Sequence, residues 1–302
     1  MVNNKLADYA WMDGKIVEFD DAKVHVLTHA LHYGSAVFEG IHSYKTDKGT
    51  AVFRLDEHIE RLFFSANSMS MELGFDKSEI KIAILQLLKK NNHDEAYIRP
   101  LAYYGFGNVG VFPKDIKARV LIVSVPWGNY HSRNLRVMTS SFIRNPPRST
   151  VFGAKISGNY SNSILAMFEA RKKGFDEALM LDEDGFVSEG PVQNFFVVKN
   201  NELVTPDSRS ALLGITRDSI ITVARDIGIK VAEREIKLEE AKNADELFFC
   251  GTATEITPII SIDDKIIGNG EAGKLTAELR DKFYEIARGK DKRYSKWLSY
   301  VN

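Results

Sequence analysis

The chain has 302 residues, with 40 lysine or arginine and 41 aspartate or glutamate residues, so its formal net charge at pH 7 is −1. This length predicts two domains, each able to bury its own core, and the balanced charge argues against nucleic acid or an anionic membrane surface as the main partner. Cys250 is the only cysteine and no apolar run reaches the roughly 20 residues that span a bilayer, so we expect a soluble cytoplasmic protein without disulfides or a membrane partner.

The first part of the chain has the pattern of a small unit of strands and helices. Residues 9–17 predict a hairpin around Asp13-Gly14, a dipeptide favoured in two-residue turns, and residues 24–27 predict another short β segment. Asp76 and Glu79 form the pattern of a capping box, which predicts the start of a helix. Alternation and helical spacing predict further strands at 41–44, 51–54, 96–104 and 119–125, and a helix with Asp56 as its N-cap.

The second part is expected to open with a strand at residues 135–139 and to continue into a helix that follows Lys155 and ends near Gly174. Because strands and helices mix without strict βαβ alternation, the pattern predicts an α+β fold rather than a doubly wound sheet. We place a small N-terminal domain at 1–127, an interdomain linker at 128–134 and a large domain at 135–302. Further expected strands lie at 177–181, 194–199, 203–205 and 246–250, and further expected helices at 216–227 and 271–287.

Lys155 lies between small residues just ahead of the expected helix. A lysine amine that is partly desolvated can lose its proton and attack an aldehyde to form a Schiff base, although most lysines are simply solvated. Glu189 favours the Schiff-base role of Lys155 over a solvated surface lysine. It follows an expected helix and strand and stands next to the turn residues Gly190-Pro191. A carboxylate there would hold a pyridine nitrogen protonated, and a protonated ring is what makes pyridoxal phosphate an electron sink.

Five short motifs occur in order along the chain. They are His29-Ala30-Leu31-His32-Tyr33-Gly34 with Val37-Phe38-Glu39-Gly40, then Tyr97-Ile98-Arg99-Pro100, residues 155–160, Gly214-Ile215-Thr216-Arg217-Asp218, and Gly251-Thr252-Ala253 leading into Glu255-Ile256-Thr257-Pro258. These motifs resemble those of the branched-chain amino acid aminotransferases, which are fold-type IV pyridoxal-phosphate enzymes, and the resemblance covers nearly the whole chain. It implies a small α/β sandwich-like N-terminal domain and a larger, mixed, β-barrel-like C-terminal domain.

The cofactor's phosphate needs hydrogen-bond donors, and a helix N-terminus supplies free N–H groups with a favourable dipole. Gly214 would allow close backbone approach and Thr216 would add a hydroxyl, although an ordinary capped helix has the same pattern. The resemblance implies that Gly214, Ile215 and Thr216 bind the phosphate and that Thr252 is a second contact. It also implies a phosphate-binding role for Arg61, which by spacing alone fits a surface ion pair.

The resemblance implies a ping-pong transamination in which Lys155 is the catalytic residue. The substrate amine displaces Lys155 from its Schiff base with pyridoxal phosphate, and the freed lysine amine moves the α-proton as general base and acid. L-Leucine, L-isoleucine and L-valine would become branched 2-oxo acids, and 2-oxoglutarate would become L-glutamate. Tyr160 resembles the residue that hydrogen-bonds the cofactor's 3′-oxygen, or it is the first aromatic residue of the helix's buried face.

The substrate site must accept both a branched alkyl group and a carboxylate. Tyr97 and Arg99 resemble donors for an acidic side chain, and the N–H groups of Thr252 and Ala253 would hold the α-carboxylate. The resemblance takes Tyr33 and the 107–111 loop from a neighbouring subunit, which implies a homodimer as the minimum active unit, with a dimer-based hexamer as a further option. The residues that resemble the apolar lining, each of which also fits plain core packing, are Tyr33, Phe38, Val111, Trp127 and Tyr130.

Three positions depart from the family pattern. Val192 stands where a glycine is usual, so a turn that needs positive φ would be strained there. Gln193 replaces a carboxylate and Leu213 replaces a proline. These departures affect the expected substrate preference more than the expected cofactor.

Other functions share part of this pattern. A D-amino acid transaminase, an R-selective amine transaminase and aminodeoxychorismate lyase have the same fold, lysine and glutamate. His25, His29 and His32 would share one face of a helix and could form a metal-binding module. However, residues 24–27 alternate like a strand and no carboxylate or cysteine completes the set, so we expect no metal. A non-catalytic structural protein of this fold is the last alternative.

Overall fold

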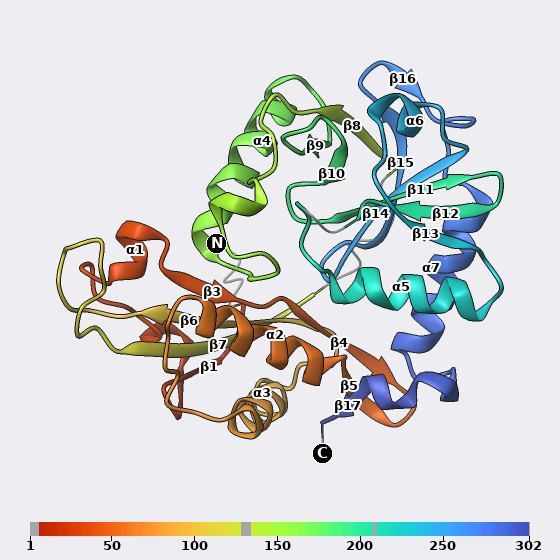
Figure 1. Cartoon of the computed structure of the whole chain (residues 1–302). Coiled ribbons are helices and arrows are strands. Elements are labelled where there is room, and N and C mark those ends of the chain that lie inside the picture. Colours follow the sequence, from red (N-terminus) through yellow and green to blue (C-terminus); the bar gives the residue numbers. More distant parts are fainter. Residues whose placement is uncertain (1–5, 128–133, 208–209, 302) are drawn as a thin grey trace, which may run out of the picture. The chain divides into compact units, whose positions relative to one another are not determined.

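The computed structural model describes residues 6–127, 134–207 and 210–301, which fall into two compact units (Figure 1). Unit 1 comprises the described residues of Met1–Asn129, Ala154–Gly158 and Ile286–Asn302, and unit 2 comprises those of Tyr130–Gly153 and Asn159–Glu285. The expected linker and domain limits stay a prediction, but two segments of the expected large domain belong to unit 1. One of these segments, Ala154–Gly158, carries Lys155. The other, the described part of Ile286–Asn302, belongs to unit 1 because its strand Leu298–Tyr300 pairs with a strand of the unit 1 sheet.

Unit 1 is built on an antiparallel sheet of eight described strands in the order β17-β5-β4-β6-β7-β1-β2, with β3 paired to β6. In the first hairpin, Asp13 and Gly14 have φ values of 44° and 91°, as a type I′ turn requires, which confirms the expected turn. The strands are β1 Tyr9–Met12, β2 Lys15–Glu18, β3 Ala36–Phe38, β4 Ile41–Thr46, β5 Gly49–Phe53, β6 Ala96–Tyr104, β7 Ala118–Pro126 and β17 Leu298–Tyr300.

Two long helices of unit 1 each bury one apolar stripe against this sheet. Leu62 of one helix and Ile84 and Leu87 of the other are fully buried, and they share one core with Ile98 and Ile122 of the sheet. Burying each such side chain contributes about 1.5–3 kcal/mol. The helical segments here are η1 Phe19–Asp21, α1 His29–Tyr33, α2 Leu55–Ser68, α3 Lys77–Asn91 and η4 Lys292–Trp297.

Three local expectations for unit 1 have different outcomes. The capping box is confirmed, because the Asp76 carboxylate accepts from the Glu79 N–H and the Glu79 carboxylate accepts from the Asp76 N–H. The expected N-cap of α2 is wrong: Arg54 takes this position in a left-handed conformation, with its N–H donating to the Trp297 carbonyl at 2.6 Å. The expected β segment at 24–27 is also wrong, since residues 24 and 25 have no regular structure and residues 26 and 27 form a turn ahead of α1.

Unit 2 is organised around a mixed sheet that closes on itself. The order is β10-β9-β8-β15-β14-β11-β12-β13, with β16 paired to β15, and an additional pairing of β10 with β11 closes a barrel. Strand β8 runs parallel to β9 and β15, so the sheet is mixed, as expected for an α+β fold. The strands are β8 Leu135–Thr139, β9 Glu177–Leu181, β10 Val187–Glu189, β11 Asn194–Lys199, β12 Glu202–Thr205, β13 Val231–Glu233, β14 Glu246–Gly251, β15 Glu255–Ile262 and β16 Lys265–Ile266.

Paired phenylalanines on β11 and β14 fill both faces of this sheet. Phe195 and Phe249 meet edge to face at 5.8 Å between ring centres, and Phe196 and Phe248 stack at 4.9 Å. All four side chains are fully buried, so these strands need apolar cover on both sides. The remaining helical segments are η2 Pro147–Ser149, η3 Ser157–Asn159, α4 Tyr160–Lys172, α5 Ile215–Asp226, α6 Leu238–Lys242 and α7 Lys274–Ala287. None of the helices within the described ranges is long and apolar enough to cross a membrane.

Candidate active site

Lys155 is held through its backbone in unit 1. Its N–H donates to Ser65 Oγ at 2.9 Å, and its carbonyl oxygen accepts from the Phe38 N–H at 3.1 Å. Ser65 lies on α2 and is fully buried, and Phe38 is the last residue of β3. Lys155 Nζ lies 4.9 Å from the centre of the Phe38 ring, at a cation–π distance. Lys155 is therefore a half-buried residue fixed between a helix and a strand.

The Phe38 ring also joins Lys155 to the expected substrate residues of this unit. Arg99 Cζ lies 4.6 Å from the ring centre, and Arg99 Nη2 donates to Tyr97 Oη at 3.0 Å. The Tyr97 ring in turn lies 4.9 Å from the Trp127 ring. The structure thus brings Phe38, Tyr97, Arg99 and Trp127 together with Lys155.

Two details describe the polar atoms of this cluster. Within the described part of the chain, the buried Arg99 Nε has no hydrogen-bond partner, and a guanidinium donor left in this way is well suited to a carboxylate. Gly40 lets the Tyr97 hydroxyl approach the backbone, because a Cβ at position 40 would lie 2.0 Å from Tyr97 Oη.

Arg61 belongs to a buried charge network on α2. Its Nε and Nη2 donate to the two carboxylate oxygens of Glu39 at 2.6 and 2.8 Å, and His58 Nδ1 lies 2.7 Å from Glu39 Oε2. Burial alone would raise the pKa of Glu39, but Arg61 and His58 outweigh it and lower the pKa to about 2. Burial lowers the pKa of His58. The Glu39 carboxylate raises this pKa, but the positive charges of Arg61 and Lys155 lower it further, and the net shift is downward. The phosphate-binding role of Arg61 stays a prediction.

Tyr33 and Val111 lie on an exposed part of unit 1. Tyr33 Oη donates to the Val109 carbonyl at 2.5 Å, and the His29 ring bonds the Gly110 carbonyl at 2.9 Å. Helix α1 is thereby tied to the loop that carries Val111, whose side chain is 75% exposed. The structure thus brings Tyr33 and Val111 together. Both side chains are exposed, so they can line a substrate site only if other groups cover them.

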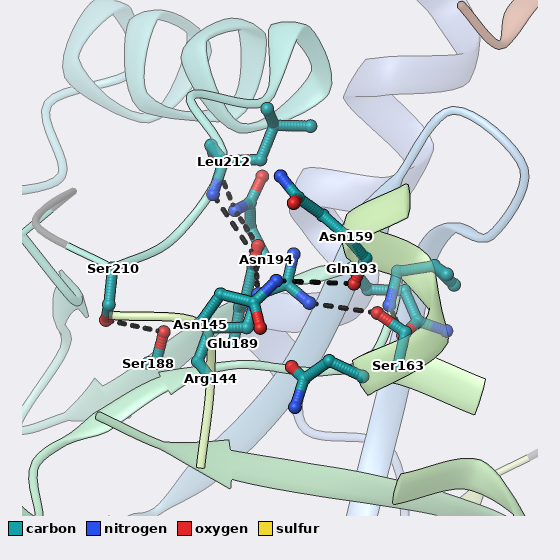
Figure 2. A network of polar contacts seen from close by, with 12 residues as sticks. Arg144, Asn145, Asn159, Ser163, Ser188, Glu189, Gln193, Asn194, Ser210 and Leu212 are labelled. Carbon is teal, nitrogen blue, oxygen red and sulfur yellow. Dashed lines mark hydrogen bonds and ion pairs between the residues drawn. The ribbon is translucent and has the colours of Figure 1, made fainter. Parts of the chain in front are cut away.

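Glu189 is the centre of a buried polar network in unit 2 (Figure 2). Arg144 Nε pairs with Glu189 Oε1 at 2.8 Å, and the Leu212 N–H donates to the same oxygen at 3.2 Å. Asn194 Nδ2 donates to Glu189 Oε2 at 3.0 Å. Because both carboxylate oxygens accept hydrogen bonds and Glu189 is 3% exposed, the plane of the carboxylate is fixed.

Asn194 connects Glu189 to the predicted phosphate loop. Its Nδ2 also donates to the Leu212 carbonyl at 2.8 Å, and a Cβ on Gly214 would lie 1.9 Å from its Oδ1. Only glycine therefore fits at position 214 beside the Asn194 side chain, and the phosphate-binding role of Gly214 stays a prediction. Gly214 is the N-cap of α5 and has no side chain to cap it, and Ile215 and Thr216 form the buried first turn. This helix start can receive an anion.

The turn that carries Thr252 and Ala253 lies at the same end of the barrel. It joins β14 to β15, and β14 pairs with β11, which pairs with the strand of Glu189. A Cβ on Gly251 would lie 3.5 Å from the Val192 carbonyl oxygen, so this turn adjoins the β10–β11 connection. Glu189, Asn194 and the half-buried Thr252 are thus gathered at one barrel rim.

The departures from the family pattern are accommodated locally. Val192 is not among the described residues with positive φ, so the strain considered from the sequence does not arise. Gln193 Nε2 donates to Glu177 Oε2 at 3.1 Å, and burial raises the pKa of Glu177. An amide is a better partner than a second carboxylate for this buried acid. Leu213 is a partly exposed residue just before the N-cap of α5.

Four functional candidates were missed from the sequence: Arg144 and Asn194 in unit 2, and Glu39 and His58 in unit 1. Glu39 lies inside the first of the five motifs, so that motif contained a signal for it. Arg144 carries no such signal, because its partners Glu189 and Ser163 are distant along the chain. Tyr160 begins α4, is half-buried and stays a predicted 3′-oxygen ligand. Tyr130 lies outside the described residues.

The three histidines considered as a metal-binding face do not form one. His29 and His32 lie in α1, whereas His25 precedes it. The His29 ring bonds the Gly110 carbonyl and the His32 ring bonds the Val26 carbonyl at 3.0 Å, so both are held by the backbone. Within the ranges that the structure describes, no three His, Cys, Asp or Glu residues are placed to hold a metal ion.

Residues 36–262 match the model of the family described as amino-transferase class IV. This match covers most of the chain, which belongs to that family. The relatives it resembles are, more particularly, branched-chain-amino-acid aminotransferases, which confirms the resemblance seen in the motifs. One from Pseudomonas aeruginosa is 41% identical over 296 residues, covering 96% of each chain.

Two solved structures of a branched-chain amino acid aminotransferase from T.th. have nearly the same fold. The first, complexed with N-(5′-phosphopyridoxyl)-L-glutamate, has a TM-score of 0.96 and 43% identity, and covers 98% of this chain and 99% of that chain. The second, complexed with 4-methylvaleric acid, has a TM-score of 0.95 and 42% identity with the same coverage. This likeness confirms the expected two-domain, fold-type IV architecture.

Proposed function

We propose that this chain is a pyridoxal-phosphate-dependent transaminase for branched-chain amino acids. It would transfer the amino group of L-leucine, L-isoleucine or L-valine to 2-oxoglutarate, giving branched 2-oxo acids and L-glutamate. The observation that carries the proposal is the half-buried Lys155, held by Ser65 and stacked on Phe38 beside Arg99, in a chain 41% identical to a branched-chain-amino-acid aminotransferase.

The residues present fit pyridoxal phosphate. The Gly214 backbone, which no Cβ blocks, and the first turn of α5 would hold its phosphate, with Thr252 and Arg61 as further donors. Glu189, fixed by its hydrogen bonds, would face the pyridine nitrogen. When bound, the cofactor supplies an electron sink for the electrons of the bond that breaks at the substrate's α-carbon.

Each proposed protein group then has a defined task. Lys155 Nζ would hold the cofactor's aldehyde carbon, and its free amine would take the proton from the substrate's α-carbon. Glu189 keeps the ring nitrogen protonated, and Tyr160 donates to the 3′-oxygen. Because Phe38 and Ser65 fix the Lys155 backbone, the amine moves only through its own side-chain torsions.

The proposed substrate site combines apolar and basic surfaces. Phe38, Trp127 and, from a neighbouring subunit, Tyr33 and Val111 would enclose the branched side chain. The buried Arg99 Nε and the Tyr97 hydroxyl would bind the second carboxylate of 2-oxoglutarate or L-glutamate. The backbone N–H groups of Thr252 and Ala253 would bind the α-carboxylate.

We propose a homodimer in the cytoplasm as the active form. The exposed apolar side chains on α1 and the 106–112 loop support the dimer, because a contiguous apolar surface of this kind is usually covered. They are Leu31 at 63% exposure, Tyr33 at 44%, Phe106 at 60%, Val109 at 68%, Val111 at 75% and Phe112 at 73%. The balanced net charge and single cysteine support the location.

The test is a visible absorption spectrum of the protein reconstituted with pyridoxal phosphate, recorded before and after addition of L-leucine. A parallel sample receives D-alanine, and a Lys155→Ala variant is the control. We expect L-leucine alone to bleach the yellow band, and the variant to lack the covalently reducible cofactor. Bleaching by D-alanine alone would transfer the proposal to D-amino acids, and a colourless protein would contradict it.

A further inference from the structure

Arg144 is a buried arginine for which the proposed chemistry has no task. It lies in the loop after β8, is 8% exposed, and divides its guanidinium between two elements of unit 2 (Figure 2). Its Nε pairs with Glu189 Oε1 on β10 at 2.8 Å, and its Nη1 donates to Ser163 Oγ on α4 at 2.9 Å. Ser163 is itself 2% exposed, so both bonds are shielded from water.

Arg144 brings a full positive charge to Glu189. The Asn194 amide and the Leu212 N–H stabilise the carboxylate as hydrogen-bond donors without charge. A carboxylate in such a buried position tends to take up a proton unless a cation compensates it. A protonated Glu189 could not keep a pyridine nitrogen protonated, so a guanidinium paired with this carboxylate supports the role proposed for it.

The second bond of Arg144 concerns position. Ser163 lies one helical turn after Tyr160, on the same helix. Arg144 therefore ties the strand of Glu189 to the first turn of the helix that presents Tyr160. The pyridine nitrogen and the carbon that bears the 3′-oxygen belong to one rigid ring, so the groups that contact the nitrogen and the oxygen must keep a fixed spacing.

We propose that Arg144 is a positioning residue for the cofactor, which holds Glu189 ionised and in register with the first turn of α4. This inference rests on the proposed function, because it requires Glu189 to face the ring nitrogen. Arg144 itself need not touch cofactor or substrate. A lysine could supply the charge but not both directed bonds, since an ammonium lacks the planar fork of a guanidinium.

The experiment uses the full-length holoenzyme and the variants Arg144→Gln, Arg144→Lys and Glu189→Gln. The matched control is Arg136→Gln, which removes an exposed arginine of the same unit that also pairs with a carboxylate, that of Asp176. Two readouts are the pH dependence of the cofactor's visible band and the rate of the first half-reaction with L-leucine in a single turnover.

We expect Arg144→Gln to displace the titration of the band in the same direction as Glu189→Gln and to slow the half-reaction about 100-fold. Arg144→Lys should recover part of the wild-type band titration and part of the half-reaction rate. Arg136→Gln should leave the titration and the rate unchanged. An Arg144→Gln protein that melts earlier but keeps the wild-type titration and rate would show that Arg144 is only structural. If Arg144→Gln does not fold, Arg144→Lys decides, since wild-type values for both readouts would overturn the inference.

The register is tested separately with Ser163→Ala, which leaves the charge in place. We expect its dissociation constant for pyridoxal phosphate to rise about tenfold with the band titration unchanged. An unchanged dissociation constant would overturn this part of the inference. If Glu189→Gln itself leaves the band and the rate unaltered, the proposed place of Glu189 fails instead, which is a different outcome from failure of Arg144.

Discussion

At the scale of single residues, small differences in side-chain chemistry decide what the barrel rim of unit 2 can bind. Asn194 is the clearest case, because one amide contacts Glu189, the Leu212 carbonyl and the backbone of Gly214. The amide nitrogen carries two hydrogens and donates one to Glu189 and one to the Leu212 carbonyl, so it links the proposed ring-nitrogen partner to the proposed phosphate loop. A carboxylate at position 194 would lose both donated bonds.

Gly214→Ala tests this link. The φ of −69° suits alanine, so any effect comes from the Cβ that would lie 1.9 Å from Asn194 Oδ1. We expect stability to fall by about 1–3 kcal/mol and cofactor affinity to fall at least about tenfold, because Asn194 must move. Thermal melting and absorbance titration measure the two effects. Adding Asn194→Ala should recover stability but not affinity, and full recovery of affinity would contradict the link.

Gln193→Glu tests the amide beside Glu177. Position 193 is 4% exposed, and burial already raises the pKa of Glu177. Two buried carboxyl groups would compete for one proton, so we expect a loss of about 1–3 kcal/mol at pH 7 that becomes smaller at lower pH. Denaturant unfolding at several pH values measures it. The exchanged pair Glu177→Gln with Gln193→Glu is the control, and it should restore most of the stability.

At the scale of elements, α2 does more than cover the unit 1 sheet. One face carries Leu62 and other apolar residues into the core, while Ser65 holds the Lys155 N–H and Arg61 holds Glu39. The helix therefore positions the proposed catalytic lysine from a rigid element, which is more exact than support from a loop.

Ser65→Ala would remove the buried acceptor of the Lys155 N–H. We expect a loss of about 1–3 kcal/mol in stability and about a tenfold slower half-reaction, because the lysine backbone is no longer fixed. Ser68→Ala is a matched control on the same helix, since the Ser68 hydroxyl bonds only a carbonyl of its own helix, that of Ser65, among the contacts described for it. An equal effect of both variants on the half-reaction would contradict a specific role for Ser65.

At the scale of the whole molecule, the two units have separate cores and need not unfold together. All three tryptophans, Trp11, Trp127 and Trp297, belong to unit 1. Tryptophan fluorescence therefore reports on the unit that holds Lys155 and the Glu39 network. Unfolding of unit 2 must be followed by another signal, such as circular dichroism.

Acid should destabilise unit 1 in two steps. The pKa of His58 is lowered from 6.5, so its contribution to stability is complete above pH 6.5 and decreases as the unfolded state takes up a proton below it. The pKa of Glu39 falls from 4.5 to about 2, so a further contribution of about 3 kcal/mol is lost between these values. Urea unfolding followed by tryptophan fluorescence measures both steps. His58→Gln should reduce the change of the unfolding free energy with pH just below pH 6.5. An unchanged pH dependence there would contradict the assignment of the first step to His58.

The sequence by itself determined the family, the α+β class and most element positions, because these depend on local patterns. Strands β6, β8, β9 and β11 were predicted with their observed limits, and the capping box of α3 and the β1–β2 turn follow from a few neighbouring residues. The motifs also contained Lys155 and Gly214, and Glu189 was marked by the adjacent turn residues Gly190-Pro191. Each of these signals lies within one short stretch of chain.

Tertiary structure alone decided what depends on distant partners. The N-cap of α2 is Arg54 because its N–H meets Trp297, some 240 residues later in the chain. Lys155 belongs to unit 1 because Ser65 and Phe38 bind its backbone, and Arg144 gains its importance from Glu189 and Ser163. Buried polar groups must find partners wherever the fold places them, and a sequence pattern does not contain those distances.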